Sequence, residues 1–141
     1  MPTSRSRVRT SSPAPMKLNA IGITTTNLAK TVEFYTLLGF EFPDHKPDEQ
    51  HLEPKISVGS AKLMIDSHDL IKEILGTDPV PSNHSAFALE YETPKELDEI
   101  VQKLKNSGFI ITKKPWDAFW GQRYAIVEDP DGYKVDLYAS L

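Results

Sequence analysis

The chain has 141 residues and a formal net charge of −4, with 39% hydrophobic and 26% charged residues. These values fit one soluble globular domain with a substantial core, and no apolar run approaches the roughly 18 residues that a membrane span needs. The lack of cysteine excludes disulfides, thiolate nucleophiles and cysteine-ligated zinc, and it fits the cytoplasmic location that we expect.

Residues 1–15 differ in composition from the rest of the chain. They carry Arg5, Arg7 and Arg9 without any acidic residue, so the remainder is more acidic than the net charge of −4 indicates. An acidic body disfavours nucleic-acid binding, which draws most of its affinity from Lys and Arg against phosphates. We expect residues 1–15 to be a disordered leader or a cloning remnant; an upstream extension before Met16 and a weak organelle presequence are the alternatives. Residues 16–141 are expected to form a single domain.

In chain order, the first half predicts a strand in NAIGITT and then a helix between Asn27, a good N-cap, and Gly39. KISVGSAKLMID predicts two paired strands around a turn at Gly59, and SHDLIKEILG predicts a short helix before the loop TDPVPSN. The second half predicts a helix from the capping box of Thr93 and Glu96 to Gly108. Its predicted strands are HSAFALEYE, GFIIT, RYAIVE and YKVDLYA.

The two halves repeat the same order of elements. Residues 17–66 and 83–140 each read as a βαβββ unit, in which Asn19-Ala20 corresponds to Asn83-His84 and AKLMID corresponds to YKVDLY. The repeat therefore predicts an α+β domain made of two similar modules.

Alternation along each strand separates an apolar side from a mixed side that could line a cleft. In the last strand, Val135 and Leu137 oppose Lys134, Asp136 and Tyr138. If residues 129–132 form a four-residue loop, Glu128 faces Tyr133 across the hairpin. This register places Arg123, Ala125 and Val127 on the cleft side.

The duplicated unit, together with NLAKTVEFYTLLGFEF, HSAFALE and WGQRYAIVEDPDGYKVDLYA, resembles the vicinal oxygen chelate superfamily. That superfamily includes glyoxalase I, ring-cleaving dioxygenases, and bleomycin and fosfomycin resistance proteins. The resemblance covers roughly residues 17–140. It implies paired βαβββ modules whose curled mixed sheets surround a cleft, with the helices outside, usually in a homodimer.

In the metal-dependent members, His and Glu on the first and last strands of each module hold a divalent ion. The matching positions here are Ala20, Met64, His84 and Asp136. Ala20 and Met64 offer neither imidazole nor carboxylate, so we expect no metal centre and no other cofactor. Zinc, nickel, manganese or iron would be required only if the chain were an enzyme.

His84 and Asp136 are the candidates for catalysis if there is any. His84 is either a group that hydrogen-bonds a ligand or a strand histidine bonded to a nearby carbonyl; a metal ligand is the weaker alternative. Asp136 is either a general base beside His84 or the partner of Arg123 or Lys134 in a salt bridge. His45, His51 and His68 lie in polar segments and are expected to be solvated.

Trp116, Phe119 and Trp120 are predicted to lie in a loop before a strand, where aromatic side chains are less expected to fill a core. Aromatic side chains beside a cleft stack on planar or cationic molecules, and the resemblance implies such clefts in metal-free antibiotic-resistance members. Packing at a dimer interface or a sheet edge is the alternative, above all for Trp120.

Our hypothesis is a metal-free protein that binds a small, partly aromatic molecule, as the bleomycin-resistance-like branch does. The predicted ligand-binding residues are Met64, His84, Trp116, Phe119, Trp120, Arg123, Asp136 and Tyr138. The alternatives are a lactoylglutathione-lyase-like lyase or isomerase and an interaction domain without catalysis. The expected partners are a small molecule and a second copy of the chain, with no membrane or nucleic acid.

Overall fold

The computed structural model describes residues 15–141, so the prediction for the leader lies, apart from Pro15, outside the described residues. The described elements are β1 (Ala20–Thr25), α1 (Leu28–Leu38), β2 (His51–Leu52), β3 (Lys62–Ser67), α2 (His68–Leu75), β4 (Ser85–Glu90), α3 (Pro94–Asn106), β5 (Ile110–Ala118), β6 (Gln122–Glu128) and β7 (Lys134–Ser140). Within that range, no helix is long and apolar enough to cross a membrane.

The predicted caps begin and end the helices. The side chain of Asn27 accepts the N–H of Lys30 at the start of α1, and Gly39 ends the helix with a φ of 118°. Thr93 accepts the N–H of Glu96 at the start of α3, where Pro94 occupies the first turn. These cap predictions are confirmed.

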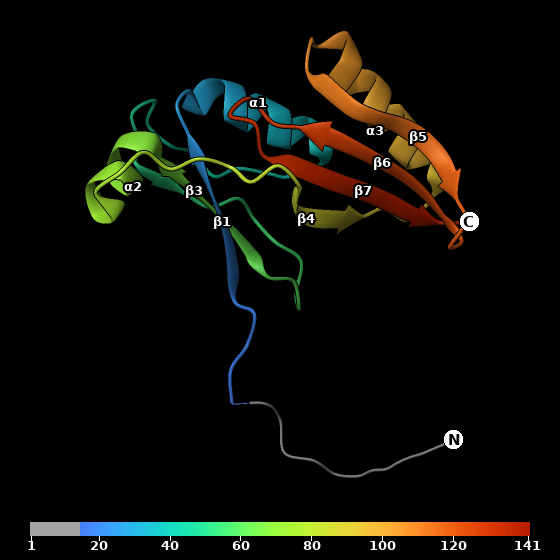
Figure 1. Ribbon diagram of the computed structural model, residues 1–141, viewed down its shortest axis with the longest axis horizontal. Coiled ribbons are helices and arrows are strands. Elements are labelled where there is room, and N and C mark those ends of the chain that lie inside the picture. Colours follow the sequence, from blue (N-terminus) through green and yellow to red (C-terminus); the bar gives the residue numbers. More distant parts are fainter. Residues whose placement is uncertain (1–14) are drawn as a thin grey trace.

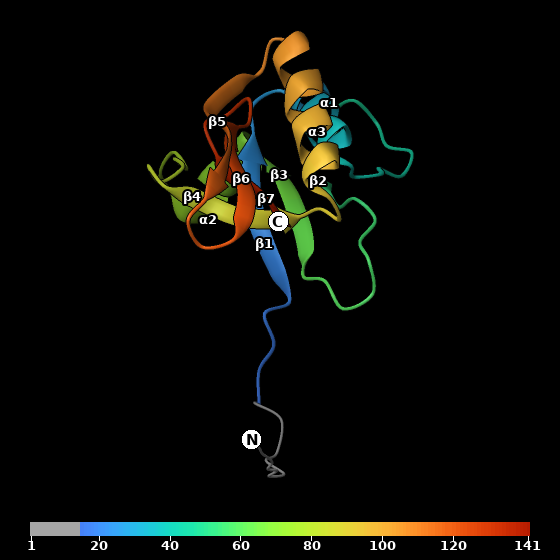
Figure 2. The same cartoon turned by 90° about the vertical axis from the view of Figure 1, so that its right-hand side faces the viewer.

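The strands form two mixed sheets, ordered β1-β3-β2 and β4-β7-β6-β5. The first and last strands of each half, β1 with β3 and β4 with β7, pair in parallel. Helices α1 and α3 lie side by side against the strands (Figures 1 and 2). This is the predicted α+β architecture, with α1 and α3 together on one side of the strands and α2 apart from them.

The predicted hairpin in KISVGSAKLMID is wrong in its first arm. On the side of β3 that faces away from β1, only His51 and Leu52 pair with it, and residues 53–61 form no strand. Pro54, two residues after Leu52, has no N–H for a ladder hydrogen bond, so the strand does not continue past it. The first module is therefore shorter than the second, although the N–H of Lys55 still donates to the carbonyl of Glu41 at 2.8 Å.

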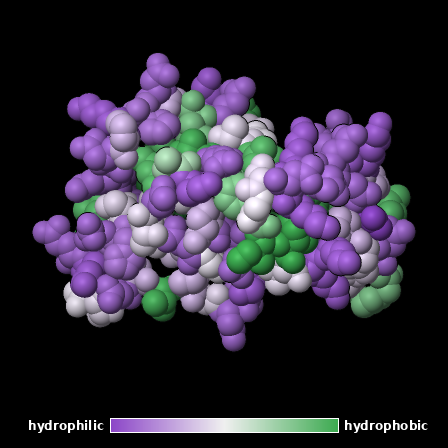
Figure 3. Space-filling model, turned by 90° about the horizontal axis from the view of Figure 1, so that it is seen from above, coloured by the Kyte–Doolittle hydropathy of each residue, from purple (hydrophilic) through white to green (hydrophobic). Residues whose placement is uncertain are grey.

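One hydrophobic core joins the two modules. Phe34 and Tyr35 of α1 are 0% exposed, and the ring of Phe34 meets that of Phe109, in the second module, edge-on at 5.2 Å between centroids. The Tyr35 hydroxyl donates to the buried carboxylate of Asp129 at 2.8 Å. Most of the outer face that carries α1 and α3 is hydrophilic, with hydrophobic residues in separate patches (Figure 3).

Candidate functional site

The register of the β6–β7 hairpin decides which side chains face away from the helices, and the prediction was off by one residue. Asp129, not Glu128, faces Tyr133: the N–H of Asp129 donates to the carbonyl of Tyr133 at 2.8 Å. The loop is thus three residues long and ends at Gly132, whose φ is 98°. As a result Ala125 and Val127 are fully buried in the core.

The side chains of Tyr124 and Ile126 therefore lie on the opposite side, which we call the open face of the second sheet. Three aromatic residues stand in register across this face, because Trp116 of β5 pairs with Tyr124 of β6 and Tyr124 pairs with Tyr138 of β7. The rings of Tyr124 and Tyr138 are stacked at 6.1 Å with an angle of 15°. Trp116 meets Tyr124 at 5.4 Å. We call these three residues the aromatic row.

Asp136 lies on the same face, next to the aromatic row. Its carboxylate accepts hydrogen bonds from the hydroxyls of Ser85 and Tyr124. The pKa of Tyr124 is raised to about 12, mainly by burial and secondly by the hydrogen bond to Asp136. This phenol therefore remains a donor at neutral pH. The carboxylate is thus held in place by two uncharged donors.

The predicted salt bridges of Asp136 are not formed. Lys134 lies 3.8 Å from Glu128 instead, and Arg123 lies on the helix side of the sheet. There the guanidinium of Arg123 pairs with Asp98 of α3 at 3.0 Å and with Asp117 at 3.1 Å. Arg123 therefore joins α3 to β5, and Asp136 has no basic partner within the described part of the chain.

His84 is displaced from its predicted position by a bulge in β4. The pairing of β4 with β7 shifts between Ser85 and Phe87, so Ser85 stands opposite Lys134 as Ala20 stands opposite Lys62. The structural counterpart of Ala20 is Ser85, and the predicted match of Ala20 with His84 was wrong. The exposed His84 ring instead contacts the carbonyl of Ser85 at 3.0 Å through Nδ1.

The aromatic residues of the segment 116–120 are divided between a strand and a turn. Trp116 lies in β5 rather than in the predicted loop, and the ammonium of Lys113 sits 4.5 Å from its ring centroid. Phe119 is 96% exposed and Trp120 49% exposed at the tip of the hairpin. The indole Nε1 of Trp120 donates to Gln122 at 2.8 Å.

The first sheet carries a polar cluster that the sequence did not indicate. Met64 and Asp66 are half-buried on the same side of β3, and Asp66 pairs with His51 across the ladder. The His51 ring contacts Asp66 at 2.5 Å through Nδ1 and Glu53 at 2.6 Å through Nε2. His51 is exposed, as predicted, but both of its ring nitrogens are also bonded to carboxylates, which was not predicted.

These contacts predict a pH-dependent stability. The hydrogen bonds that the His51 ring donates to Asp66 and then to Glu53 raise the pKa of His51 above its usual 6.5. A raised pKa in the folded state means that the stabilisation is fully present below the unfolded value and is lost as the pH rises through the folded value. We expect an NMR titration of the His51 ring to give a pKa above 6.5 and Asp66→Asn to lower it. An unchanged midpoint in Asp66→Asn would contradict this assignment.

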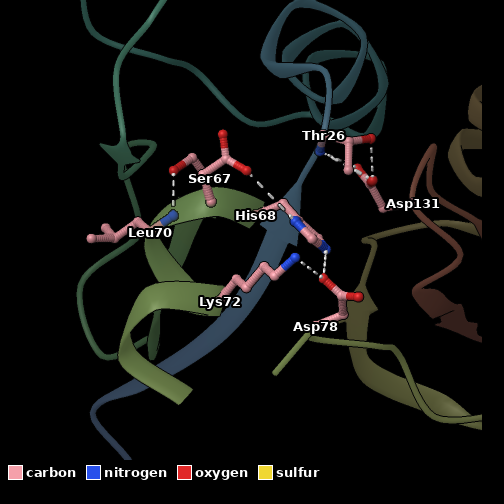
Figure 4. A network of polar contacts seen from close by, with 8 residues as sticks. Thr26, Ser67, His68, Leu70, Lys72, Asp78 and Asp131 are labelled. Carbon is pink, nitrogen blue, oxygen red and sulfur yellow. Dashed lines mark hydrogen bonds and ion pairs between the residues drawn. The ribbon is translucent and has the colours of Figure 1, made fainter. Parts of the chain in front are cut away.

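A second polar network surrounds His68 at the start of α2 (Figure 4). Its Nε2 lies 3.7 Å from Asp78, which also pairs with Lys72 at 3.2 Å. Nearby, Thr26 donates through its hydroxyl to Asp131 at 2.6 Å. These contacts tie α2 to the following loop and β1 to the β6–β7 turn, and they lie apart from the open face.

One family model matches most of the chain. The model of the Glyoxalase/Bleomycin resistance protein/Dioxygenase superfamily matches residues 17–137. The chain belongs to this superfamily. None of the curated proteins compared with the chain matches it. The family assignment agrees with the resemblance seen in the sequence.

Solved structures of the superfamily share the fold. A glyoxalase/bleomycin resistance protein/dioxygenase from Nocardioides is 25% identical, with a TM-score of 0.66 over 95% of this chain and 87% of that one. A glyoxalase-related enzyme from Fulvimarina pelagi is 16% identical, with a TM-score of 0.74 over 88% of each chain. A lactoylglutathione lyase from Agrobacterium tumefaciens is 17% identical, with a TM-score of 0.63 over 91% of this chain and 96% of that one. The last two show a common fold only.

The residues at the metal positions do not fit the divalent ion of the metal-dependent members of this superfamily. Ala20 has no donor atom and Met64 offers only a soft thioether, while the bulge brings the hydroxyl of Ser85 rather than an imidazole next to Asp136. Asp136 is then the single carboxylate among these positions, and none of them supplies an imidazole. In residues 15–141 no group of three or more His, Cys, Asp or Glu side chains is arranged to hold a metal.

Proposed function

We propose that this superfamily member binds a small, partly aromatic organic molecule on the open face of the second sheet, without a metal ion. The aromatic row is the observation that supports the proposal. Trp116, Tyr124 and Tyr138 are held in register by three neighbouring strands, so their rings form a fixed surface for a planar group. Such a surface requires little ordering of side chains when the ligand arrives.

Asp136 gives this surface a preference for charge. Its carboxylate has two hydroxyl donors but no basic partner within residues 15–141. A protonated amine on the ligand would supply the missing positive charge and would also be attracted to the faces of the neighbouring rings. We therefore infer that the ligand is a planar molecule that carries a cation, with Trp120, whose ring meets those of Trp116 and Tyr124, as a further apolar contact.

Calorimetric titration with two planar dyes tests the proposal. We expect 9-aminoacridine, a cation, to bind, and 1-anilinonaphthalene-8-sulfonate, an anion, to bind at least about tenfold more weakly because it faces Asp136. Trp116→Ala should weaken the binding of 9-aminoacridine about tenfold, since one stacking surface is lost. Asp136→Asn should bring the two dyes closer in affinity.

The control variant is Ile74→Ala, which removes a surface hydrophobic residue of α2 that is 68% exposed and lies outside the site. It should leave both affinities unchanged. Flat titrations with both dyes, or equal losses in Trp116→Ala and Ile74→Ala, would rule out the aromatic row as the binding surface. The lyase or isomerase alternative gains no support from the contacts of His84 and Asp136, because each is bonded to Ser85 rather than to the other.

A further inference from the structure

An open groove of about 610 Å³ lies between the two modules and begins at Tyr138. One wall is the strand β4 with Tyr91 after it, and the other is the loop 55–60 together with the first residues of β3. The end of α1 forms the floor, where the hydroxyl of Tyr91 donates to the carbonyl of Leu38 at 2.6 Å. We call this feature the β4 groove. Its volume is in the range of known ligand pockets.

Apart from the shared core and the hydrogen bond of Tyr91 to Leu38, the modules are joined by hydrogen bonds near the end of β1. Near the end of β1, Thr24 is hydrogen-bonded to the hydroxyl of Tyr133 at 3.0 Å, and Thr26 to Asp131 at 2.6 Å. Near its beginning, Ile21 faces the groove. Strands β1 and β4 belong to different sheets, so no ladder of hydrogen bonds closes the gap between them.

The wall formed by β4 is an unpaired strand edge. The N–H of Tyr91 donates to Tyr138 of β7 at 2.8 Å, which shows that odd-numbered residues at this end of β4 point their backbone groups at β7. Backbone groups alternate along a strand, so those of Ala88 and Glu90 point the other way, into the groove. Within the described chain β4 is the last strand on this side of its sheet. Two residues thus offer N–H and C=O groups to an added strand.

The charges of the groove select the kind of strand. Glu90 and Glu96 line it, and neither has a basic partner within 4.0 Å among the described residues. The two lysines of the groove are already paired with carboxylates outside it: Lys55 lies 3.6 Å from Glu41, and Lys62 lies 3.8 Å from Glu53. The charge left without a partner in the groove is therefore negative.

We propose that the β4 groove binds a short extended peptide that adds a strand to β4 and carries basic side chains toward Glu90. Alternate side chains of such a peptide face the interior side of the groove, which is apolar and includes Phe40 and Leu63. The peptide thus needs hydrophobic and basic residues in alternation. The peptide is bound through backbone groups of β4, whereas the ligand of the aromatic row contacts side chains of the open face; Tyr138 borders both sites.

The probe is the peptide acetyl-Val-Lys-Val-Lys-Val-amide, added to the isotope-labelled full chain. We expect slower hydrogen exchange at the amides of Ala88 and Glu90 on binding, whereas the amide of Tyr91 is already protected by β7. Two matched peptides separate the contribution of backbone hydrogen bonds from that of charge. A peptide N-methylated on the edge that faces β4 should bind about tenfold more weakly or worse. The glutamate analogue acetyl-Val-Glu-Val-Glu-Val-amide should also bind more weakly.

Two variants link the effects to the groove. Ala88→Pro removes one donor at a strand edge, where proline is tolerated, and should weaken the lysine peptide about fivefold. Glu90→Gln should reduce the preference for the lysine peptide over the glutamate peptide. The proposal is overturned if the lysine peptide does not bind, if N-methylation has no effect, or if Ala88 and Glu90 gain no protection.

Discussion

Asp129→Ala is expected to lower the free energy of unfolding by about 3 kcal/mol. One carboxylate oxygen of Asp129 accepts the hydroxyl of Tyr35 at 2.8 Å, and the other accepts the N–H groups of Asp131 and Tyr133, each at 2.9 Å. Alanine removes all three acceptor contacts and leaves the Tyr35 hydroxyl without this partner at 0% exposure. Urea unfolding followed by circular dichroism measures the loss.

Asp131→Ala is the matched control for this prediction. Asp131 lies in the same turn, and its carboxylate accepts the hydroxyl and N–H of Thr26 in an exposed position. Its removal should cost about 1 kcal/mol or less, because water can replace the lost contact. Equal losses in the two variants would show that the buried hydrogen bond to Tyr35 is not the cause.

The same carboxylate makes stability depend on pH in acid. Burial, as the largest effect, raises the pKa of Asp129 above its ordinary 3.8. The stability linked to its proton is fully present below the ordinary value and is lost as the pH rises through the raised value. Asparagine does not titrate. As the pH rises from the ordinary to the raised pKa of Asp129, the free energy of unfolding of Asp129→Asn should therefore increase relative to that of the natural chain.

Phe34→Ala is expected to lower the free energy of unfolding by about 4 kcal/mol. The ring is 0% exposed and meets Tyr35 at 5.0 Å and Phe109 at 5.2 Å, in both cases edge-on. Removing it leaves a cavity between α1 of the first module and the second module. Urea unfolding gives the difference, and the midpoint should fall without a large change in slope.

Phe119→Ala removes the same atoms from a side chain that is 96% exposed. It should change the free energy of unfolding by about 0.5 kcal/mol or less. Comparison of the two variants therefore separates the effect of burial on the free energy of unfolding from the effect of residue type. A loss in Phe34→Ala as small as that in Phe119→Ala would mean that α1 does not pack tightly against the second module.

Alternation of apolar residues predicted the buried faces of most strands correctly. Ile23, Leu63, Ile65, Val135 and Leu137 are all buried as expected, because each of these strands has a face covered by the core. The first and last residues of the helices could also be predicted, since capping residues act over a few positions along the chain. Short sequence patterns were therefore sufficient to predict most of the fold.

The candidate site depended on registers that local signals do not determine. The Asp-Pro-Asp-Gly sequence predicts a turn, but the loop is one residue shorter than expected: Asp129 belongs to the ladder, and its side chain accepts the N–H groups of Asp131 and Tyr133. Because of that single shift, Tyr124 lies on the open face where Arg123 was expected. The bulge in β4 moved His84 in the same way, and a bulge has no clear signature in these residues.

Two other differences arise from tertiary pairing. Lys113 to Ala118 contains a proline and three charged residues, which favours a loop, yet it continues β5 with two register shifts. Pro115 is tolerated there because β5 is at the edge of its sheet. His51 was missed because its partner Asp66 is fifteen residues away, and an isolated histidine in a polar segment gives no sign of such a contact.

The shared core also has a consequence for the origin of the repeat. The helix of the first half fills the core of the second, and Tyr35 completes the hydrogen bonds of the second half's last turn. An ancestral chain with only one half would have left these apolar and polar groups exposed. A second copy of such a chain would have been needed to cover these groups, which would place the contact between Phe34 and Phe109 at an interface between two molecules.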